Sequence, residues 1–505
     1  MSVGSPFNAS FVRVTARLLL VTLFLIGLVR AVRYGIYVFI RVQNPFDAQY
    51  LESAMVHFAW RVQHGVSLYP DWEHYPYVAN FYAPLSFVII GMIGRALGTN
   101  IHGLYVIGRS VSVVSVLATT LVVGFVLKRR YGALPALFGM LLTLGVCPQF
   151  GPGVMTRPDA LADCLGLTGF LLAGGRRRTT ATAGALVLYL AAMTKQTALV
   201  YLAAAALGLC IEGRTRRSLT LLLAVASALL VTVLVVRWAI EPNFVRCLLG
   251  ESTTPFRFHC WWSTVRDVAS IDPEFFVLSA AGVALWSTGP RREPGLAALA
   301  VLLLAASVLT AAKCGSGTNY FLGVSSVAAL AGGALWSEMT LPNSRPKVWQ
   351  LLAATAVGGG LLLSTKASGA YAQLAHLDRM LSTSKETVDL HHRLYRTAEN
   401  PSSHLLTDDG MIDIHQGERT VFADPYRFKL MVETGQINPA RLRQMIADSH
   451  YELIITSKDL FADDYSSYDF GLPGVLAKEA RLHYEPVGQL YGRFFYSKRA
   501  QSSPH

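Results

Sequence analysis

Long stretches without a charged residue recur along most of this sequence, and they restrict its possible folds more than any other feature. Examples are residues 18–29, 110–127, 219–236 and 297–312. Only 15% of the 505 residues are charged, against about 25% in a soluble globular domain. A helix needs roughly 20 mostly apolar residues to cross a bilayer. The sequence therefore predicts a mainly α-helical protein, a bundle of helices that crosses a membrane many times.

Short basic clusters separate the apolar runs and predict the orientation of the chain. They lie at residues 128–130, 176–178, 214–217, 291–292 and 345–347. Lys and Arg concentrate in cytoplasmic loops, so topology explains the net charge of +12 better than nucleic-acid binding does. The N-terminus, which carries Arg13 and Arg17, is then cytoplasmic. The junctions that alternate with the clusters are predicted to face outward; they are 151–159, 195–196, 241–272 and 313–319.

These assignments predict about eleven crossings and two domains. The run at 84–97 is short, and we expect it to be a partial segment that does not cross. Residues 1–368 form the transmembrane module, with a first outer loop at 41–83. The composition becomes polar after about residue 368. We therefore expect residues 369–505 to form a small extracytoplasmic α/β domain.

Local patterns within the polar region predict individual elements. Helical spacing covers 371–399, and Asn438 and Pro439 suit the start of a helix at 439–448. Short strands are predicted at 404–407 and 453–456, and a hairpin at 484–496. We interpret Asp408, Asp409, Asp413 and Asp424 as loop and turn residues.

The first outer loop is dense in carboxylates and aromatic rings. Asp47 and Glu52 lead a series of acids and histidines, interleaved with tyrosines and tryptophans up to Tyr82. Residues 48–63 can form an amphipathic helix on the membrane face. Carboxylates bind hydroxyls and ring faces pack on sugar C–H surfaces, so the loop suits a carbohydrate ligand. An interfacial aromatic belt with solvated acids is the alternative interpretation.

Three cations stand apart from the basic clusters, on the side predicted to face outward. Arg157 precedes Pro158 and Asp159 at the start of an apolar helix, and Lys195 and Lys313 lie between apolar runs. Charges at membrane depth are costly and commonly functional. Together the three would suit an anionic phosphate. The alternatives are snorkelling side chains and, for Asp159, a helix start at the positive end of the dipole.

The six cysteines show no metal-ligand spacing. Cys247 and Cys260 fall in one predicted outward loop, where an oxidising compartment would permit a disulfide. Two unpaired thiols are the other interpretation.

The ordered set of short motifs over residues 1–340 resembles the GT-C superfamily of membrane glycosyltransferases. That superfamily includes protein O-mannosyltransferases and bacterial aminoarabinose transferases. The extracytoplasmic C-terminal domain resembles the extra domain of some bacterial members. The matching segments are Asn44-Pro45-Phe46-Asp47 with Glu52, His64-Gly65-Val66-Ser67-Leu68-Tyr69, Asn80-Phe81-Tyr82-Ala83-Pro84-Leu85, Gly108-Arg109, Arg157-Pro158-Asp159, Lys195-Gln196 and residues 315–321.

The resemblance implies roles for individual residues. Asp47 corresponds to the catalytic acid of the first outer loop, and Asp159 to the second outer acid. Glu52 follows Asp47 by five positions, whereas many members have two acids adjacent or three apart. Arg157, Lys195 and Lys313 would lie near the lipid phosphate. The remaining substrate-binding candidates are Asn319, Tyr82, His64 and Tyr69.

The implied function is transfer of a sugar from a polyprenyl-phosphate lipid to an acceptor hydroxyl, with inversion and with Asp47 as general base. The acceptor would be a lipid, glycan or protein, the enzyme would lie in the cell membrane, and we expect no cofactor and no metal. The C-terminal domain is assigned to acceptor docking or site closure. A lipid or sugar transporter or flippase, and a non-catalytic lipid-sugar binding protein, are the rival interpretations.

Overall fold

The computed structural model describes two compact units, each of which combines distant parts of the chain. Unit 1 comprises Met1–Asn44, Gly108–Thr232 and Thr253–Asp378, and unit 2 comprises Pro45–Ile107, Val233–Ser252 and Arg379–His505. The described residues are 9–44, 46–47, 51–145, 151–250, 256–271, 273–289, 292–313, 317–340, 385–463, 465, 471–490 and 492–499.

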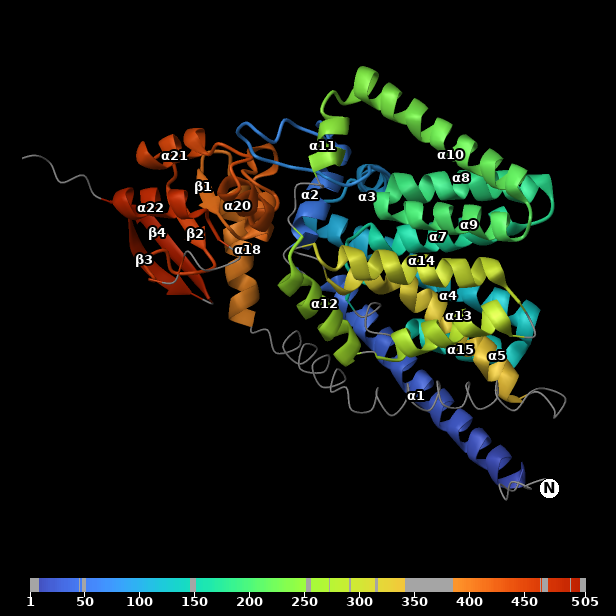
Figure 1. The fold of residues 1–505 in the computed structure, drawn as a ribbon. Coiled ribbons are helices and arrows are strands. Elements are labelled where there is room, and N and C mark those ends of the chain that lie inside the picture. The colour runs from blue at the N-terminus through green and yellow to red at the C-terminus, as the bar shows by residue number, and fades with distance from the viewer. Residues whose placement is uncertain are drawn as a thin grey trace, which may run out of the picture. The chain divides into compact units, whose positions relative to one another are not determined.

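Unit 1 is built from helices (Figure 1). Its described elements are α1 (Ala9–Gln43), most of α4 (Ile101–Tyr131), α5 (Ala133–Leu144), α7 (Asp159–Gly174), α8 (Arg178–Thr194), η1 (Gln196–Ala198), α9 (Leu199–Ile211), most of α10 (Thr215–Val235), α12 (Phe258–Ile271), α13 (Glu274–Thr288), α14 (Pro294–Thr310), η4 (Thr318–Phe321) and α15 (Leu322–Thr340).

Helix α15 lies in the centre of unit 1. In the segment Thr318–Glu338, 94% of an 18-residue apolar window is buried, whereas in Thr215–Ile240, which contains α10, only 11% of such a window is buried. Residues of α7, α9 and α14 join α15 in one hydrophobic core. Small residues allow close helix packing; for example, a Cβ on Gly184 of α8 would lie 2.4 Å from the backbone of Ala173 in α7.

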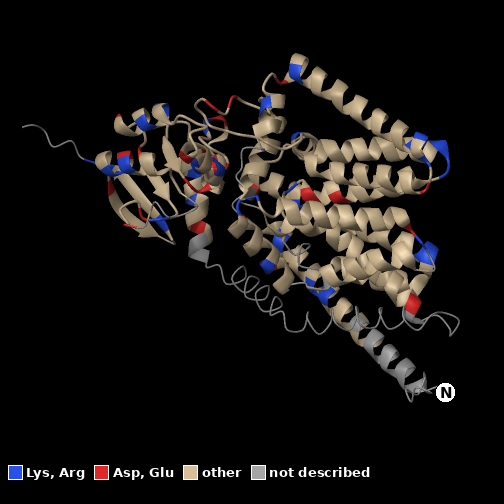
Figure 2. Cartoon of the chain, viewed as in Figure 1, with Lys and Arg blue, Asp and Glu red and all other residues tan. Residues whose placement is uncertain are grey.

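The predicted cytoplasmic clusters that the structure describes gather at one end of unit 1, where blue segments of the ribbon concentrate in Figure 2. The loops before α8 and α10 are joined by hydrogen bonds from arginines to backbone carbonyls, and the end of α4 is joined to the start of α14 by an ion pair. Asp159 begins α7 at its other end, 16 residues away, or about 24 Å. The contacts at the basic end are Arg214 to Gly174, Arg217 to Arg176 and Arg130 to Glu293.

Three helices in the described part of the chain are long and apolar enough to cross a membrane by length and composition. They are Ile101–Tyr131, Thr215–Ile240 and Thr318–Glu338. Shorter apolar helices accompany them, among them α3 (Leu85–Leu97). Its 13 residues extend about 20 Å, less than the roughly 30 Å of a hydrocarbon core. The count of about eleven crossings stays a prediction, and the last predicted crossing, at 348–364, lies outside the described residues.

Unit 2 joins the first outer loop to the C-terminal domain. Its elements before the domain are α2 (Leu51–His64), α3, the start of α4, η2 (Val236–Ile240) and α11 (Phe244–Gly250). The domain contains α18 (Lys385–Glu399), β1 (Leu405–Thr407), α19 (Gly410–Ile414), η5 (Gly417–Arg419), α20 (Pro425–Glu433), α21 (Ala440–Ala447), β2 (Leu453–Thr456), α22 (Gly474–His483), β3 (Tyr484–Leu490) and β4 (Arg493–Lys498).

The four strands form one sheet in the order β1-β2-β4-β3. β1 pairs with β2 in parallel, with Leu405 opposite Leu453, and the connection between them contains α19, α20 and α21. β4 pairs antiparallel with β2 and β3. This confirms a small α/β domain, the strand at 453–456 and the closing hairpin. Of the helix predicted at 371–399, the structure describes α18, and residues 371–384 lie outside the described residues.

Helix α2 differs from its prediction. Residues 48–63 were expected to lie on the membrane face, but nearly every residue from Leu51 to Arg61 is buried, including Glu52, Ser53 and His57. The reason is that α2 is covered from two sides within unit 2. Helix α3 packs against it at Gly91, and the C-terminal domain packs against it at Gly410 and Gly417.

The acids of the C-terminal domain have structural roles, but not all of them are turn residues. Asp409 and Asp424 accept backbone N–H groups at the starts of α19 and α20. Asp408 and Asp413 are buried. Asp413 lies within α19 and accepts the N–H groups of Val421 and Phe422, so the loop interpretation is wrong for Asp413. Asp408 lies at a bend directly after β1, as that interpretation expects.

The two cysteines of the predicted outward loop differ in their oxidation state. Cys260 is disulfide-bonded, whereas Cys247 is a free, buried thiol. The two are therefore not paired with each other, and the interpretation of both as free thiols is wrong for Cys260.

Candidate functional site

Asp159 organises a buried ionic cluster in unit 1. Lys195 Nζ lies 2.5 Å from Asp159 Oδ1, and Asn319 Nδ2 donates to the same oxygen at 2.8 Å. Arg157 Nε lies 3.2 Å from Oδ2. All four residues are buried, so the charges attract one another with little screening. The structure thus brings together four predicted site residues that span more than 160 positions of sequence.

Asp159 lies at the start of α7, as the helix-start interpretation expects, and its carboxylate also belongs to the ionic cluster. Pro158 takes the N-cap position of α7 and Asp159 the first helical position, with no side-chain cap. The carboxylate binds Lys195, Asn319 and Arg157, so it does not serve as a cap. The chain turn that places Lys195 there lies between α8 and η1, where Lys195 has extended backbone.

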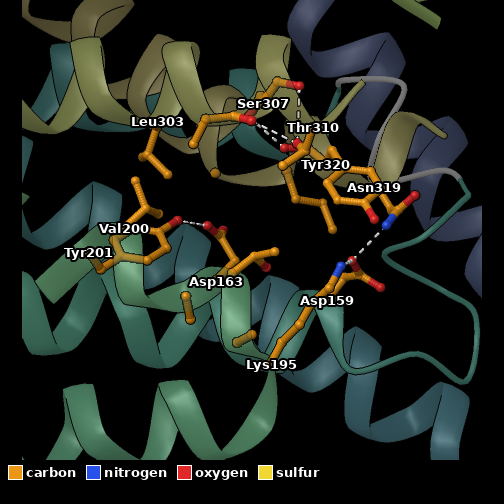
Figure 3. Close-up of a pocket in the computed structure, with 16 residues that line it drawn as sticks. Asp159, Asp163, Lys195, Val200, Tyr201, Leu303, Ser307, Thr310, Asn319 and Tyr320 are labelled. Carbon is orange, nitrogen blue, oxygen red and sulfur yellow. Dashed lines mark hydrogen bonds and ion pairs between the residues drawn. The ribbon is translucent and has the colours of Figure 1, made fainter. Parts of the chain in front are cut away.

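Asp159, Lys195 and Asn319 of the cluster line one end of a cavity of about 70 Å³. Helices α7, α9 and α14 and the segment that begins α15 surround the cavity (Figure 3). Lys195 Nζ also lies 4.6 Å from the centre of the Tyr320 ring. Lys195 is therefore the cation of the cluster that lies at the cavity wall.

Asp163 lines the same cavity, one helical turn after Asp159. Its Oδ1 accepts the hydroxyl of Tyr201, and its Oδ2 accepts the hydroxyl of Ser326 at 2.8 Å. Asp163 is not among the site residues predicted from the sequence. Its spacing of four from Asp159 within an apolar helix was a usable signal, because residues i and i+4 share one helix face.

Of the three predicted phosphate-binding cations, only Lys195 lines the cavity. Arg157 reaches it through Asp159, and the backbone of Lys313 pairs with Phe256 in an isolated antiparallel bridge. A contribution of Lys313 to phosphate binding stays a prediction.

Asp47 lies in unit 2, beside the C-terminal domain. Its backbone N–H donates to the sulfur of Met411 at 3.0 Å. Phe46, its neighbour, contacts the ring of His391 edge to face, with the centroids 4.8 Å apart. The predicted catalytic residue is therefore in contact with elements more than 300 positions away in the sequence.

Two tyrosines complete the surroundings of Asp47. Tyr105 of α4 lies close to the carboxylates of both Asp47 and Glu52, so the two acids share a neighbour despite their unusual spacing. Tyr395 of α18 lies near Asp47 and Asp409. Burial, followed by the charges of Asp409 and Asp47, raises the pKa of Tyr395. Neither tyrosine was identified from sequence, since each is brought there by tertiary packing.

The other predicted ligands of unit 2 occupy distinct environments. Tyr69 is buried, and its hydroxyl donates to the backbone oxygen of Tyr82 at 2.8 Å. His64 is exposed at the end of α2 and stacks on Trp60, with ring centroids 4.3 Å apart. Roles in substrate binding for Tyr69, Tyr82 and His64 stay predictions.

Asp47 belongs to unit 2 and Asp159 to unit 1. The roles that the resemblance implies would require both acids to line one cavity, and this stays a prediction.

Comparison with known proteins relates the fold to one superfamily. No protein-family model and no curated protein sequence matches the chain. The crystal structure of ArnT from Cupriavidus metallidurans bound to undecaprenyl phosphate matches with a TM-score of 0.57 and 15% identity, over 95% of this chain and 99% of that one. The apo oligosaccharyltransferase of Archaeoglobus fulgidus matches with a TM-score of 0.51 and 14% identity, over 97% of this chain and 75% of that one. Both are GT-C glycosyltransferases, which confirms the predicted resemblance at the level of the fold.

The expectation of no metal stays a prediction. Among the described residues, no group of three or more His, Cys, Asp and Glu side chains is arranged to hold a metal ion. The Archaeoglobus fulgidus oligosaccharyltransferase was also crystallised with Zn and sulfate; that structure matches with a TM-score of 0.50 and 12% identity, over 94% of this chain and 73% of that one.

Proposed function

We propose that this protein is a membrane glycosyltransferase that moves a sugar from a polyprenyl-phosphate donor to an acceptor hydroxyl on the extracytoplasmic face. The observation that carries the proposal is the buried cluster of Lys195, Arg157 and Asn319 around Asp159 beside a cavity. The fold supports it, because a similar fold in ArnT was crystallised with undecaprenyl phosphate.

The donor phosphate would bind at the end of the cavity that Lys195 and Asn319 line. Lys195 and Arg157 would stabilise the charge that develops on the phosphate as the glycosidic bond breaks. Asp159 would hold the two cations in position, and Asn319 would fix the orientation of Asp159. Buried hydrogen bonds between charged groups are worth about 1.5–3 kcal/mol each.

Asp47 would act as the general base. An acceptor hydroxyl is a weak nucleophile until a carboxylate within hydrogen-bond distance removes its proton. Attack on the anomeric carbon opposite the departing phosphate would invert that centre. Glu52 lies close to the same tyrosine as Asp47 and would contribute to the charge of this region. We infer an extracytoplasmic location for the reaction, supported by the disulfide at Cys260.

The test uses the purified full-length protein in lipid nanodiscs with a radiolabelled polyprenyl-phosphate sugar. The wild type should release polyprenyl phosphate and transfer sugar to an acceptor, or slowly to water. Asp47→Asn should lower transfer by at least about 100-fold, as loss of a general base does, with unchanged folding and membrane insertion. Asp389→Asn, in the exposed part of α18 in the same unit, is the matched control and should retain wild-type activity.

The same assay tests the phosphate site. Lys195→Met should weaken binding of polyprenyl phosphate roughly 10-fold or more, and Lys195→Arg should restore part of it. Lys478→Met, exposed on α22, should have no effect. Normal transfer by Asp47→Asn would remove Asp47 from the mechanism. Movement of intact lipid-linked sugar across the membrane of sealed vesicles, without bond cleavage, would instead identify a flippase.

A further inference from the structure

Helix α19 of the C-terminal domain contacts the chain at two nearby positions, Asp47 and Ser53. Met411, in helix α19, accepts the backbone N–H of Asp47 at its sulfur, 3.0 Å away. On the other side, α19 packs against Ser53 in the first turn of α2. Since α2 begins at Leu51, these two contacts hold the chain just before and just after its entry into the helix.

Gly410 makes this close approach possible. A Cβ atom on Gly410 would lie 2.4 Å from the side-chain oxygen of Ser53, far inside van der Waals contact. Ser53 is itself fully buried. A Cβ at position 410 therefore requires Ser53 or α19 to move, and a shift of α19 would move Met411 relative to Asp47.

Helix α19 is in turn fixed to the sheet by an ion pair. Asp409 Oδ1 accepts the backbone N–H of Met411 at 3.0 Å, which caps the start of α19. Its Oδ2 receives Nε and Nη2 of Arg493 at 2.7 and 2.6 Å. Arg493 is the first residue of β4, so the position of α19 depends on the closing strand of the domain.

Helix α18 adds a second support. The hydroxyl of Tyr395 donates to the sulfur of Met411 at 3.7 Å. The Tyr395 ring stacks on His415, directly after α19, with centroids 4.1 Å apart and planes 4° from parallel. Met411 is thus positioned by the hydrogen bond of its N–H to Asp409 and by the hydroxyl of Tyr395. Its sulfur in turn accepts the backbone N–H of Asp47.

We propose, building on the function proposed above, that α19 positions Asp47 for proton abstraction, with Asp409 and Arg493 as positioning residues for the transfer reaction. The C-terminal domain then acts on the chemical step itself, in addition to any contact it makes with the acceptor. A displacement of about 1 Å of a reacting group can lower the rate roughly 100-fold, so a contact to the backbone of Asp47 suffices for a large effect.

The primary test compares two glycine substitutions in the full-length protein. Gly410→Ala should lower the kcat of sugar transfer about 10- to 100-fold and shift the acid limb of the kcat profile against pH, which reports the ionisation of the general base. The affinity for polyprenyl phosphate should stay unchanged. The control is Gly474→Ala, at the first position of α22, where a Cβ would meet nothing within 4 Å; it should match the wild type. Equal kcat and equal pH profiles for the two variants would overturn the proposal.

A second pair of variants covers the case in which Gly410→Ala fails to fold. Arg493→Gln adds no bulk and removes the ion pair, so it should reproduce the loss of kcat in milder form, and Arg493→Lys should recover part of it. Asp409→Asn keeps an oxygen that caps α19 but removes the charge, and should behave like Arg493→Gln. Wild-type kcat in both Arg493→Gln and Asp409→Asn would contradict the proposal.

Hydrogen exchange separates this inference from the proposed function. The Asp47 amide should exchange faster in Gly410→Ala and Arg493→Gln than in Gly474→Ala, whether or not the protein transfers sugar. A wild type without transferase activity would overturn the proposed function, whereas unchanged exchange at Asp47 in both variants would overturn the positioning role of α19.

Discussion

The pKa values of two buried carboxylates in the C-terminal domain, Asp408 and Asp413, depend strongly on their surroundings. Asp408 Oδ1 accepts the N–H of Ser457 at 2.7 Å, and Asp413 accepts the N–H of Phe422 at 3.0 Å. Burial raises the pKa of each to about 7, despite these hydrogen bonds. Because the folded pKa lies above the ordinary value of about 3.9, their contribution to stability is complete below pH 4 and is lost as the pH rises to 7.

We therefore expect Asp408→Asn to stabilise the C-terminal domain at pH 8 but not at pH 4. The amide keeps an oxygen for the Ser457 N–H and carries no charge. The gain in the free energy of unfolding should be on the order of 1.4 kcal/mol for each unit by which the pKa was raised. Thermal proteolysis of the full-length chain, with cleavage detected within residues 385–499, measures it. Asp463→Asn, at an exposed position, is the control; a gain that is independent of pH would contradict the linkage.

At the residue scale, the sequence identified polar groups that its apolar context left unexplained. Lys195 and Arg157 stood out because nothing basic surrounds them at membrane depth, and the structure places both on Asp159. Asp163 had a local signal as well. Tyr105 and Tyr395 had none, because ordinary tyrosines acquire a role only when packing brings them beside Asp47. No local pattern in the sequence contains that information.

At the element scale, prediction succeeded where the pattern is local and failed where burial comes from distant segments. The strand at 453–456 and the hairpin 484–496 follow from β-branched, aromatic and turn residues, and β2, β3 and β4 confirm them. Helix α2 was assigned a solvent-facing polar side. That side is instead covered by the C-terminal domain, which lies more than 300 residues away.

Close packing of α7 and α8 offers a test of how unit 1 holds its cavity. A Cβ on Gly184 would lie 2.4 Å from the Ala173 backbone, whereas a Cβ on Gly174 would meet nothing within 4 Å. Gly184→Ala should therefore destabilise unit 1, by roughly 1–3 kcal/mol as other overpacked positions do. Gly174→Ala, at the end of α7, should be neutral. Thermal unfolding in detergent measures both, and equal melting temperatures would show that α8 can shift without cost.

At the scale of the whole molecule, composition predicted a membrane-embedded helical bundle with a small α/β domain, and the fold agrees. Composition does not fix the number of crossings, because several apolar helices have only 13–17 residues. Hydropathy alone does not decide whether such helices cross a bilayer. The proposed chemistry adds a further requirement, since the cavity beside Asp159 and the domain beside Asp47 must face the same compartment.

Side-specific cysteine labelling tests this requirement directly. With the exposed Cys210 replaced by Ser, Thr179→Cys marks the basic end of α8, Thr197→Cys marks the cavity end, and Ser402→Cys marks the C-terminal domain; all three positions are exposed. Helix α8, whose 17 residues extend about 26 Å, contains the first position near its start and ends before the second. An impermeant maleimide should modify Thr197→Cys and Ser402→Cys from the extracytoplasmic face and Thr179→Cys only in inverted vesicles, since basic clusters stay in the cytoplasm. Labelling of Thr197→Cys and Ser402→Cys from opposite faces would place the proposed phosphate site and the base in different compartments, and direct transfer between them would then be impossible.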